Sequence, residues 1–339
     1  MSAPYGPLTA CAEATANIAM VKYWGKRDSI LNLPVADSVA LCLDSFPTRV
    51  LVTQAETAQD EVIWSGRPVQ PPQLGRFGRI LALLRERSGL RCTTRTEVRP
   101  QLPDAVGLAG SSAAFAAFAL AASAAFRVEM SERELSALAR LGSGSASRSV
   151  PGGFARWHRG QQADGSDSFS ERFASALHWP ELRLLAVIVS RQPKPVSSTV
   201  GMIRTSRTSA LFPLFADQCS RLAPEAQAAI EGRDFDRLAR IAELSAQTLH
   251  GLCLTASPPI LYVRQRTIEL LELACDLKRS VPLFFTLDAG PNPIFVTLAP
   301  HDLSVSREIL QRFPDVEILS CGVGGGVRVA DPGPIRSPS

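Results

Sequence analysis

The sequence predicts an α+β protein with two domains. Its 339 residues are more than a single hydrophobic core usually holds. Apolar runs with the spacing of strands and of helices recur along the whole chain. Hydrophobic residues make up 45% of the chain and charged residues 20%, which is an ordinary composition for a soluble globular protein. We therefore expect disorder only at the two ends.

The domain boundary is expected near residue 182. A strongly apolar run begins there, over 182–190, and has the composition of a buried strand. The prediction divides the chain into a first domain over 1–181 and a second over 182–330. The last residues, 331–339, are rich in proline and serine and are predicted to be a disordered tail.

Charge and cysteine usage exclude several classes of protein. The net charge is +4 and the pI is near 8.8, which is too weak to indicate a nucleic-acid partner and fits a small polyanionic substrate equally well. The cysteine count is odd and no Cys-x-x-Cys pair occurs, which favours reduced thiols over a disulfide framework or a zinc site.

Targeting and membrane signals are weak. The N-terminus has no basic segment followed by an apolar one, so we predict no signal peptide and expect a cytoplasmic protein. Only residues 105–126 are apolar enough to be considered as a membrane span. Their alanine, glycine and serine content makes them weakly hydrophobic, so a buried helix is the better interpretation and no membrane partner is expected.

The first hundred residues alternate between apolar runs and turns. Residues 11–24 are apolar except where Asn17, Lys22 and Tyr23 interrupt them, and residues 25–28 are expected to turn the chain. The further elements expected here are strands over 39–43 and 48–53, a helix over 73–89 and a strand over 92–99.

Three cations, Lys22, Lys26 and Arg27, lie within six residues of each other. Such a cluster is usually a solvated face. Because this one lies between apolar runs and contains Tyr23 and Trp24, the lining of a site is more plausible here.

A loop rich in glycine and serine precedes a long alanine-rich run at 113–126. Gly107 and Gly110 lie just before Ser111 and Ser112, where glycine permits a tight turn and serine suits a helix N-cap. A loop that leads into a helix N-terminus presents free N–H groups to an anion, most often phosphate. A well-capped core helix is the alternative. The Walker and dinucleotide-binding patterns are both absent, so a nucleotide would be held in another fold.

A second loop with small hydroxyl residues follows the next helix. That helix is expected to begin after Ser131, with Glu134 completing a capping box, and to end near Arg140. Residues 142–149 then place serines and glycines around Arg148, which suits oxyanion binding because arginine offers a bidentate charged fork. A flexible linker is the alternative. A linker would not need an arginine followed at once by an apolar strand at 154–157, so we favour a site.

The second domain is expected to mix strands and helices. Ser197, Ser198 and Thr199 form a hydroxyl-rich loop before a helix. The elements expected after it are helices over 223–231, 234–250 and 259–278, strands over 283–287 and 294–298, a helix over 303–313 and a glycine-rich turn over 322–326 between two short strands.

Asp288 follows the buried strand at 283–287 and precedes a Gly-Pro turn. A carboxylate in that position is well placed to act as a general base. An Asx-type turn cap is the alternative, and it is the more common one when no other motif is present.

Five segments occur together in one order and spacing: residues 16–28, 31–34, 107–113, 142–149 and 288–292. In this order they resemble the diphosphomevalonate decarboxylases of the GHMP kinase superfamily, over nearly the whole chain. The run from Lys22 to Asp28 and the run from Gly142 to Ser149 are the most specific parts of the match.

The resemblance implies a GHMP kinase fold, with a ribosomal-protein-S5-like N-terminal domain and a ferredoxin-like C-terminal domain. It implies ATP and Mg²⁺, and a reaction that phosphorylates the 3-hydroxyl of mevalonate 5-diphosphate and then releases phosphate and CO₂ to give isopentenyl diphosphate. A homodimer is implied as well.

The resemblance also implies roles for particular residues. Asp288 would be the base or would orient the hydroxyl, Arg148 would hold the substrate carboxylate or a nearby phosphate, and Lys22 would lie beside the reacting centre. The positions implied around the substrate diphosphate are Tyr23, Lys26, Ser143, Gly144, Ser145, Ser198 and Thr199. Those implied for the ATP triphosphate are Gly107, Leu108, Ala109, Gly110, Ser111 and Ser112, with Ser111 also a candidate ligand of an Mg²⁺ held mainly by the phosphates.

Two departures from the family pattern keep alternatives open. Where the family usually has Asn-Ser-Ser after Leu-Pro-x, this chain has Ala36-Asp37-Ser38, and Asp37 is expected to add a negative charge near the polyanion site. Gly110 stands where the family often has serine. The alternatives are a decarboxylase of mevalonate 5-phosphate or a related phosphorylated 3-hydroxy acid, a 3-kinase without decarboxylation, and a catalytically idle relative. Because Asp288, Lys22 and Arg148 are all present, decarboxylation is favoured.

Overall fold

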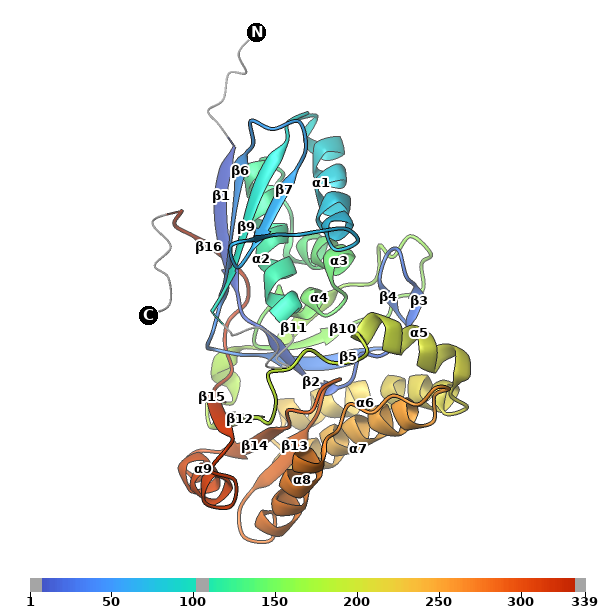
Figure 1. The fold of residues 1–339 in the computed structure, drawn as a ribbon, viewed down its shortest axis with the longest axis vertical. Coiled ribbons are helices and arrows are strands. Elements are labelled where there is room, and N and C mark those ends of the chain that lie inside the picture. The colour runs from blue at the N-terminus through green and yellow to red at the C-terminus, as the bar shows by residue number, and fades with distance from the viewer. Residues whose placement is uncertain (1–7, 102–109, 333–339) are drawn as a thin grey trace.

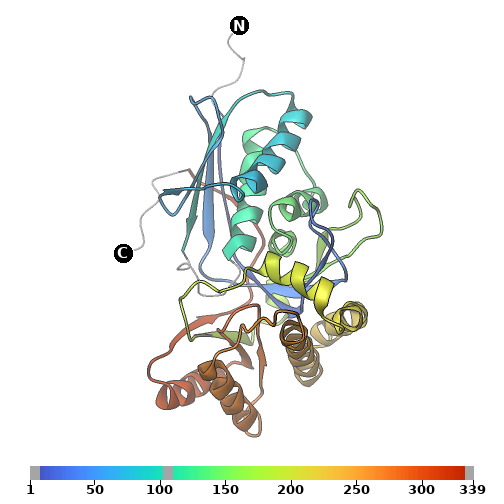
Figure 2. The same cartoon turned by 45° about the vertical axis from the view of Figure 1, so that its right-hand side comes forward.

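The computed structural model describes residues 8–101 and 110–332 and contains three main sheets with helices packed on them (Figure 1). The expected α+β composition is confirmed. The helices and the six-stranded sheet of the N-terminal half lie at one end of the long axis. The C-terminal sheet and its helices lie at the other end, and α5 (Ser198–Thr208) lies between the two halves in both views (Figures 1 and 2).

The first sheet has six strands, and its neighbouring strands are antiparallel except for a parallel pair of β7 with β9. In spatial order they are β16 (Arg328–Ala330), β1 (Thr9–Ala14), β6 (Thr48–Gln54), β9 (Thr94–Pro100), β7 (Glu61–Trp64) and β8 (Arg67–Pro68). Val50 and Val52 of β6 alternate with more exposed residues and point into the core, as the period of a half-buried strand requires.

Helix α2 (Gly110–Ala125) packs on that sheet, and α1 (Leu74–Ser88) and α3 (Glu132–Gly142) pack on α2 in the same core. The alanines of α2 allow the helix to lie close against β1 and β6, and most of its residues are buried. Phe115 and Phe118 of α2 fill the space beneath α1, with ring centroids 4.6 and 4.8 Å from that of Phe77. The predicted capping box of Ser131 and Glu134 is present at the start of α3.

The second sheet is antiparallel and has four strands. They are β11 (Ser170–Ala174), β10 (Phe154–Trp157), β5 (Ser38–Cys42) and β2 (Asn17–Val21). Two helices, α6 (Phe212–Glu231) and α7 (Phe235–Leu254), pack against it and belong to the same buried core. A one-turn helix, α4 (Ala146–Ser149), and the small hairpin of β3 (Lys26–Asp28) with β4 (Leu33–Pro34) flank this sheet.

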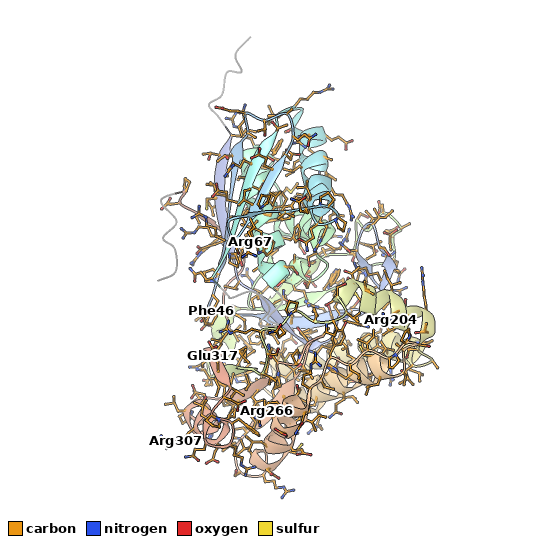
Figure 3. The ribbon with its side chains drawn as sticks, viewed as in Figure 1. Phe46, Arg67, Arg204, Arg266, Arg307 and Glu317 are labelled. Atoms are coloured by element: carbon orange, nitrogen blue, oxygen red, sulfur yellow. The ribbon has the colours of Figure 1, made fainter. Side chains whose placement is uncertain are left out.

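The third sheet carries helices on both faces. In order it contains β13 (Leu283–Thr286), β14 (Ile294–Leu298), β12 (Leu182–Ile188) and β15 (Glu317–Cys321). On β12, Leu184 faces the core of α6 and α7, whereas Leu185 faces α8 (Gln265–Leu277) and α9 (His301–Arg312). Because both faces of the sheet are covered, the residues of β12 are apolar except for Arg183. Exposed charged side chains such as Arg307 and Glu317 lie on the outside (Figure 3).

The end of the chain returns to the first sheet. After β15 the glycine-rich turn leads into β16, which pairs with β1 so that Cys11 lies opposite Ala330. Glu13 on β1 is almost fully buried and accepts hydrogen bonds from Arg49 and Arg328. The predicted division of the chain near residue 182 stays a prediction.

Several element boundaries differ from those predicted. Helix α6 begins at Phe212, not at 223. Pro224 lies inside the helix, although proline is typical of the first turn, and for this reason the predicted start was too late. Helix α8 begins at Gln265 instead of 259, and residues 26–28 form strand β3 instead of a simple turn. The short elements β7, β8, β11, α4 and the 3₁₀ turn Ala176–His178 were not predicted.

The alanine-rich segment is a buried helix, as expected. Helix α2 is enclosed by the core that it shares with α1 and the six-stranded sheet. Within the described ranges, no helix has both the length and the hydropathy that crossing a bilayer requires.

Candidate active site

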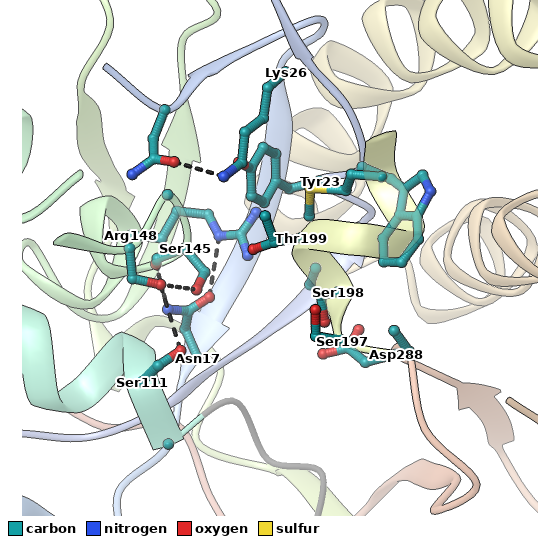
Figure 4. A pocket seen from close by; sticks show the side chains of 18 of the residues that line it. Asn17, Tyr23, Lys26, Ser111, Ser145, Arg148, Ser197, Ser198, Thr199 and Asp288 are labelled. Carbon is teal, nitrogen blue, oxygen red and sulfur yellow. Dashed lines mark hydrogen bonds between the residues drawn. The ribbon is translucent and has the colours of Figure 1, made fainter. Parts of the chain in front are cut away.

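A cleft of about 580 Å³ lies between the two halves, and both contribute to its walls (Figure 4). It gathers most of the residues that the sequence analysis singled out: Lys22, Tyr23, Lys26, Gly110, Ser111, Ser143, Gly144, Ser145, Arg148, Ser198, Thr199 and Asp288. Ser112 is fully buried and does not line the cleft. The other three positions expected in the ATP loop, Gly107, Leu108 and Ala109, lie outside the described residues.

Asp288 and Lys22 meet on the wall of the cleft. Asp288 lies just beyond β13 and Lys22 just beyond β2, and α7 joins the two regions by accepting a hydrogen bond from the Lys22 backbone N–H at Ser245 Oγ. The Lys22 Nζ lies 2.6 Å from Asp288 Oδ1 and 2.9 Å from the carbonyl oxygen of Ala19. The Lys22 side chain is 2% exposed, whereas the Asp288 side chain is 30% exposed. The carboxylate therefore faces the cleft, and the lysine lies buried behind it.

The two groups shape each other's ionisation. Burial lowers the pKa of Lys22, and the charge of Asp288 opposes that effect. For Asp288, burial would raise the pKa. The charge and hydrogen bond of Lys22 outweigh burial, with further help from Arg148 and Lys194, and hold the pKa of the carboxyl below its usual range. The site therefore presents an ionised carboxylate at neutral pH.

Arg148 is buried and held rigidly. Its Nε donates to Asn17 Oδ1 at 3.0 Å and its Nη1 donates to Ser38 Oγ at 2.7 Å. The Asn17 amide is itself fixed, because its Nδ2 donates to the Ser145 carbonyl and to Ser149 Oγ. Burial lowers the pKa of Arg148 to about 10, so the guanidinium stays protonated at neutral pH. A fixed cation of this kind can orient a carboxylate or a phosphate.

Tyr23 presents a buried hydroxyl that is not used by the described protein groups. Its ring packs on Trp157 with centroids 4.6 Å apart, and its Oη has no hydrogen-bond partner among the described residues. Burial raises the pKa of Tyr23, so the hydroxyl is a neutral donor. Gly144 permits this placement, since a Cβ there would lie 2.6 Å from Tyr23 Oη. An unsatisfied buried hydroxyl on the wall of a cleft fits a ligand oxygen.

A cationic wall forms where the β3–β4 hairpin meets α1. Lys26 Nζ donates to Asn32 Oδ1 at 2.6 Å, and Arg76 and Arg79 of α1 line the cleft beside it. Burial, with the charges of Arg76 and Arg79, lowers the pKa of Lys26 to about 8. The two arginines were not predicted from the sequence. They face one way because they are three residues apart on a helix, but that spacing alone does not separate a site from a solvated face.

The start of α2 forms the opposite wall. Gly110 and Ser111 line the cleft there, and Ser111 Oγ lies 3.4 Å from Ser143 Oγ. A Cβ on Gly110 would meet no atom of the described residues within 4 Å. Trp64 and Pro100 add apolar surface to the cleft, and neither was singled out from the sequence.

The segment before α5 corrects another expectation. Ser198 and Thr199 are the first residues of α5, not part of a loop, and Ser197 is the N-cap that accepts from the Val200 backbone N–H. Lys194, which the sequence analysis missed, donates to Ser198 Oγ at 2.9 Å and to the Ala289 carbonyl at 3.0 Å. This lysine links the start of α5 to the loop that carries Asp288.

Two charged residues lie outside the cleft, contrary to expectation. Asp37 does not add charge to the anion site, because its carboxylate accepts from Arg156 at 2.7 and 3.0 Å and from the Arg159 backbone N–H at 2.7 Å. Arg27 does not line the site either, because its Nη2 donates to carbonyl oxygens of the 159–162 loop.

The charge of the cleft is strongly unbalanced. Among the described residues it is lined by six cationic side chains and one carboxylate, and the cations are Lys22, Lys26, Arg76, Arg79, Arg148 and Lys194. Together with the serine hydroxyls and the N-terminus of α2, this set fits a ligand or ligand pair with several phosphate groups.

Comparisons with known proteins agree with that chemistry. A family model described as the diphosphomevalonate decarboxylase-like N-terminal domain matches residues 14–170. A second, described as the mevalonate 5-diphosphate decarboxylase C-terminal domain, matches residues 184–325. The diphosphomevalonate decarboxylase of Aspergillus fumigatus is 38% identical to this chain over 315 residues, which are 85% of this chain and 76% of that protein.

Solved structures match the fold over nearly the whole chain. Mevalonate diphosphate decarboxylase from Staphylococcus aureus superposes with a TM-score of 0.90 at 31% identity, covering 96% of this chain and 99% of that one. The structure of MDDEF in complex with MVAPP, AMPPCP and magnesium superposes with a TM-score of 0.89 at 31% identity, covering 96% of this chain and all of that one. The GHMP kinase fold that the sequence motifs imply is thereby confirmed.

Proposed function

The chain belongs to the diphosphomevalonate decarboxylase family, and we propose that it converts mevalonate 5-diphosphate to isopentenyl diphosphate. The reaction consumes ATP and releases ADP, phosphate and CO₂. The observation that carries the proposal is the contact of Asp288 with Lys22, beside the fixed Arg148, in a cleft lined by six cations.

The cleft fits the two phosphorylated substrates and a metal ion bound with them. The start of α2 brings the positive end of the helix dipole and the Ser111 hydroxyl to the cleft wall, which suit the ATP triphosphate. Mg²⁺ would be held mainly by the phosphates, with Ser111 as its protein ligand, and it would neutralise charge on the phosphoryl groups. Lys26, Arg76, Arg79 and the unpartnered Tyr23 hydroxyl suit the substrate diphosphate.

Asp288 orients the 3-hydroxyl of the substrate in the first step. Its Oδ1 is engaged by Lys22, and its Oδ2 has no hydrogen-bond partner among the described residues, so Oδ2 is placed to accept from the hydroxyl. Because its pKa is held low, the carboxylate is a weak base and takes the proton only as phosphoryl transfer proceeds.

The same carboxylate assists the second step after it has released that proton to solvent, which its low pKa favours and which restores its negative charge. Loss of phosphate from the tertiary carbon leaves positive charge there, and a fixed anion stabilises that charge without rearranging. Arg148 holds the substrate carboxylate so that the bond to the departing CO₂ stays aligned with the carbon that loses phosphate. Its hydrogen bonds to Asn17 and Ser38 keep the guanidinium in place throughout.

A 3-kinase without decarboxylation would use much of the same machinery, and product analysis separates the two reactions. We expect equal amounts of ADP and CO₂ from mevalonate 5-diphosphate and ATP; ADP formed without CO₂ would identify a kinase.

Comparing mevalonate, its 5-phosphate and its 5-diphosphate as substrates tests how many phosphate groups the substrate carries. Because Lys26, Arg76 and Arg79 lie together, we expect the diphosphate to be preferred.

The family resemblance also supports a homodimer located in the cytoplasm. Analytical ultracentrifugation of the purified full-length chain tests the first of these, and imaging of the tagged protein in its host tests the second. A monomer at micromolar concentration would contradict the proposed assembly.

A further inference from the structure

Asn32 lies between the two strands of the β3–β4 hairpin. Its side chain contacts Lys26 within the hairpin and joins the hairpin to α3. Asn32 is 6% exposed and occupies a left-handed backbone conformation with φ of 54°. Its Oδ1 accepts from Lys26 Nζ at 2.6 Å. Its Nδ2 donates to the carbonyl oxygens of Arg140 and Leu141, at 2.9 and 3.1 Å, in the last turn of α3.

This network fixes which way the amide points. The two carbonyl oxygens of α3 can only accept, so the NH₂ end of the amide must face them. The oxygen end is left for the Lys26 ammonium, which can only donate. The C-terminus of α3 therefore determines the position of the Lys26 charge through a single buried amide.

The surroundings of Lys26 contain cations and no carboxylate partner among the described residues. Arg76 and Arg79 of α1 lie on one side, and the buried Arg140 of α3 lies behind Asn32 and donates from Nε to the Leu31 carbonyl. A neutral acceptor thus holds the ammonium without neutralising it. The charge of Lys26 remains available to an anion in the cleft.

We propose that Asn32 is a positioning residue, whose neutral amide aims the Lys26 ammonium into the cleft and leaves its full charge for a phosphate group of the substrate. This inference rests on the proposed function for the identity of that substrate. The competing view is that Asn32 serves only to close the hairpin, since asparagine is favoured at left-handed positions.

Two substitutions separate these views. Aspartate and glycine both accept the left-handed backbone at position 32, so they change the contact with Lys26 and keep the turn. Asn32→Asp keeps an oxygen acceptor beside Lys26 and adds a negative charge, so it would pair with the ammonium. Asn32→Gly removes the acceptor and keeps the turn. Arg27→Gln is the matched control: it loosens the same hairpin from the 159–162 loop, and Arg27 does not line the cleft.

The experiment measures KM for mevalonate 5-diphosphate, KM for ATP, kcat and the alkaline limb of kcat/KM for all four proteins. We expect both Asn32 variants to raise the substrate KM by about tenfold, the size of one charge-assisted hydrogen bond, with KM for ATP within about threefold of wild type. In Asn32→Asp the alkaline limb should move to higher pH, because a carboxylate favours the charged lysine. Arg27→Gln should match the wild type.

Wild-type substrate KM in either Asn32 variant would overturn the inference, and so would an equal loss in Arg27→Gln. Calorimetric binding of inorganic pyrophosphate to the same proteins keeps the test independent of turnover. If wild-type enzyme releases no CO₂, the proposed function fails, whereas weaker pyrophosphate binding by both Asn32 variants alone would still support the role of Asn32.

Discussion

The Nζ of Lys22 lies 2.6 Å from Oδ1 of Asp288, although the two residues are 266 positions apart in the chain. The contact joins the end of a strand in the second sheet to the end of a strand in the third, across the two halves of the molecule. The buried lysine keeps the carboxylate ionised, and the carboxylate faces the cleft. Binding groups from one half are in this way combined with the reactive carboxylate of the other.

Replacing the carboxylate tests its role. Asp288→Asn keeps the shape of the side chain and removes its charge, so kcat should fall by about 10²–10⁴-fold while ATP still binds. Asp37→Asn is the matched control, because Asp37 pairs with Arg156 outside the cleft and its loss should leave kcat within about twofold. Steady-state CO₂ release and fluorescent-nucleotide binding provide the two readouts. Near-wild-type turnover in Asp288→Asn would contradict the assigned role.

Arg148→Lys tests whether a fixed fork is needed and not merely a positive charge. Lysine cannot donate to both Asn17 and Ser38 while also facing the cleft, so its ammonium would be misplaced. We expect kcat/KM for the decarboxylation to fall by at least about 100-fold, since the lost interactions are charge-assisted and buried. A variant with unchanged substrate KM and kcat would show that Arg148 does not contact the substrate.

The pKa of Lys26, lowered to about 8, predicts a pH dependence of substrate capture. Below that pH the lysine is charged and attracts the substrate phosphates; above it the free enzyme loses the charge. The kcat/KM for mevalonate 5-diphosphate should therefore decline as the pH rises through about 8, because this ratio reports ionisations of the free enzyme. Lys26→Arg should remove that decline, since arginine keeps its proton throughout the range. An identical decline in Lys26→Arg would assign it to another group.

Gly144→Ala should weaken substrate binding by displacing Tyr23. The new Cβ would lie 2.6 Å from Tyr23 Oη, which is closer than packed atoms allow, so the ring must move. We expect a rise of about tenfold or more in the substrate KM, from loss of the hydroxyl donor, with KM for ATP nearly unchanged. Gly251→Ala on α7, where a Cβ meets no described atom within 4 Å, controls for the added methyl group. Equal KM values in the two variants would argue against a Tyr23 contact.

Gly110→Ser tests whether the departure at this position weakens nucleotide binding. A Cβ there meets no atom within 4 Å in the part of the chain that the structure describes, so we expect a serine to be accepted at the start of α2 and to add a hydroxyl to the cleft wall. We expect KM for ATP to fall by about threefold to tenfold, and the variant to melt at the same or a higher temperature because glycine is a poor helix former. An unchanged or higher KM for ATP would show that this position does not limit nucleotide affinity.

Much of the site could be predicted because its residues occur in compact runs. The run from Lys22 to Asp28 and the run from Gly142 to Ser149 bring small, hydroxyl and cationic residues together locally, and the structure places most of them on one cleft. The strands at 182–188 and 283–286 could also be predicted, because strands buried on both faces are rich in apolar residues.

The parts that were missed depend on tertiary contacts. Arg76, Arg79 and Lys194 join the cleft only because α1 and the segment before α5 pack around it, and isolated cations of this kind are usually solvated. Asp37 appeared to belong to the anion site from its place in the chain, but strand β10 brings Arg156 beside it. The start of α6 was misplaced because local propensity cannot show that packing tolerates Pro224 within the helix.

The Asp288–Lys22 site is proposed to couple phosphorylation to decarboxylation. The most direct test is the ratio of ¹⁴CO₂ to ADP released from carboxyl-labelled mevalonate 5-diphosphate and ATP in a single-turnover experiment with the full-length chain. We predict one CO₂ for each ADP in the wild type, and loss of both products together in Asp288→Asn. ADP without CO₂ from the wild type, or undiminished release of both from Asp288→Asn, would contradict the claim.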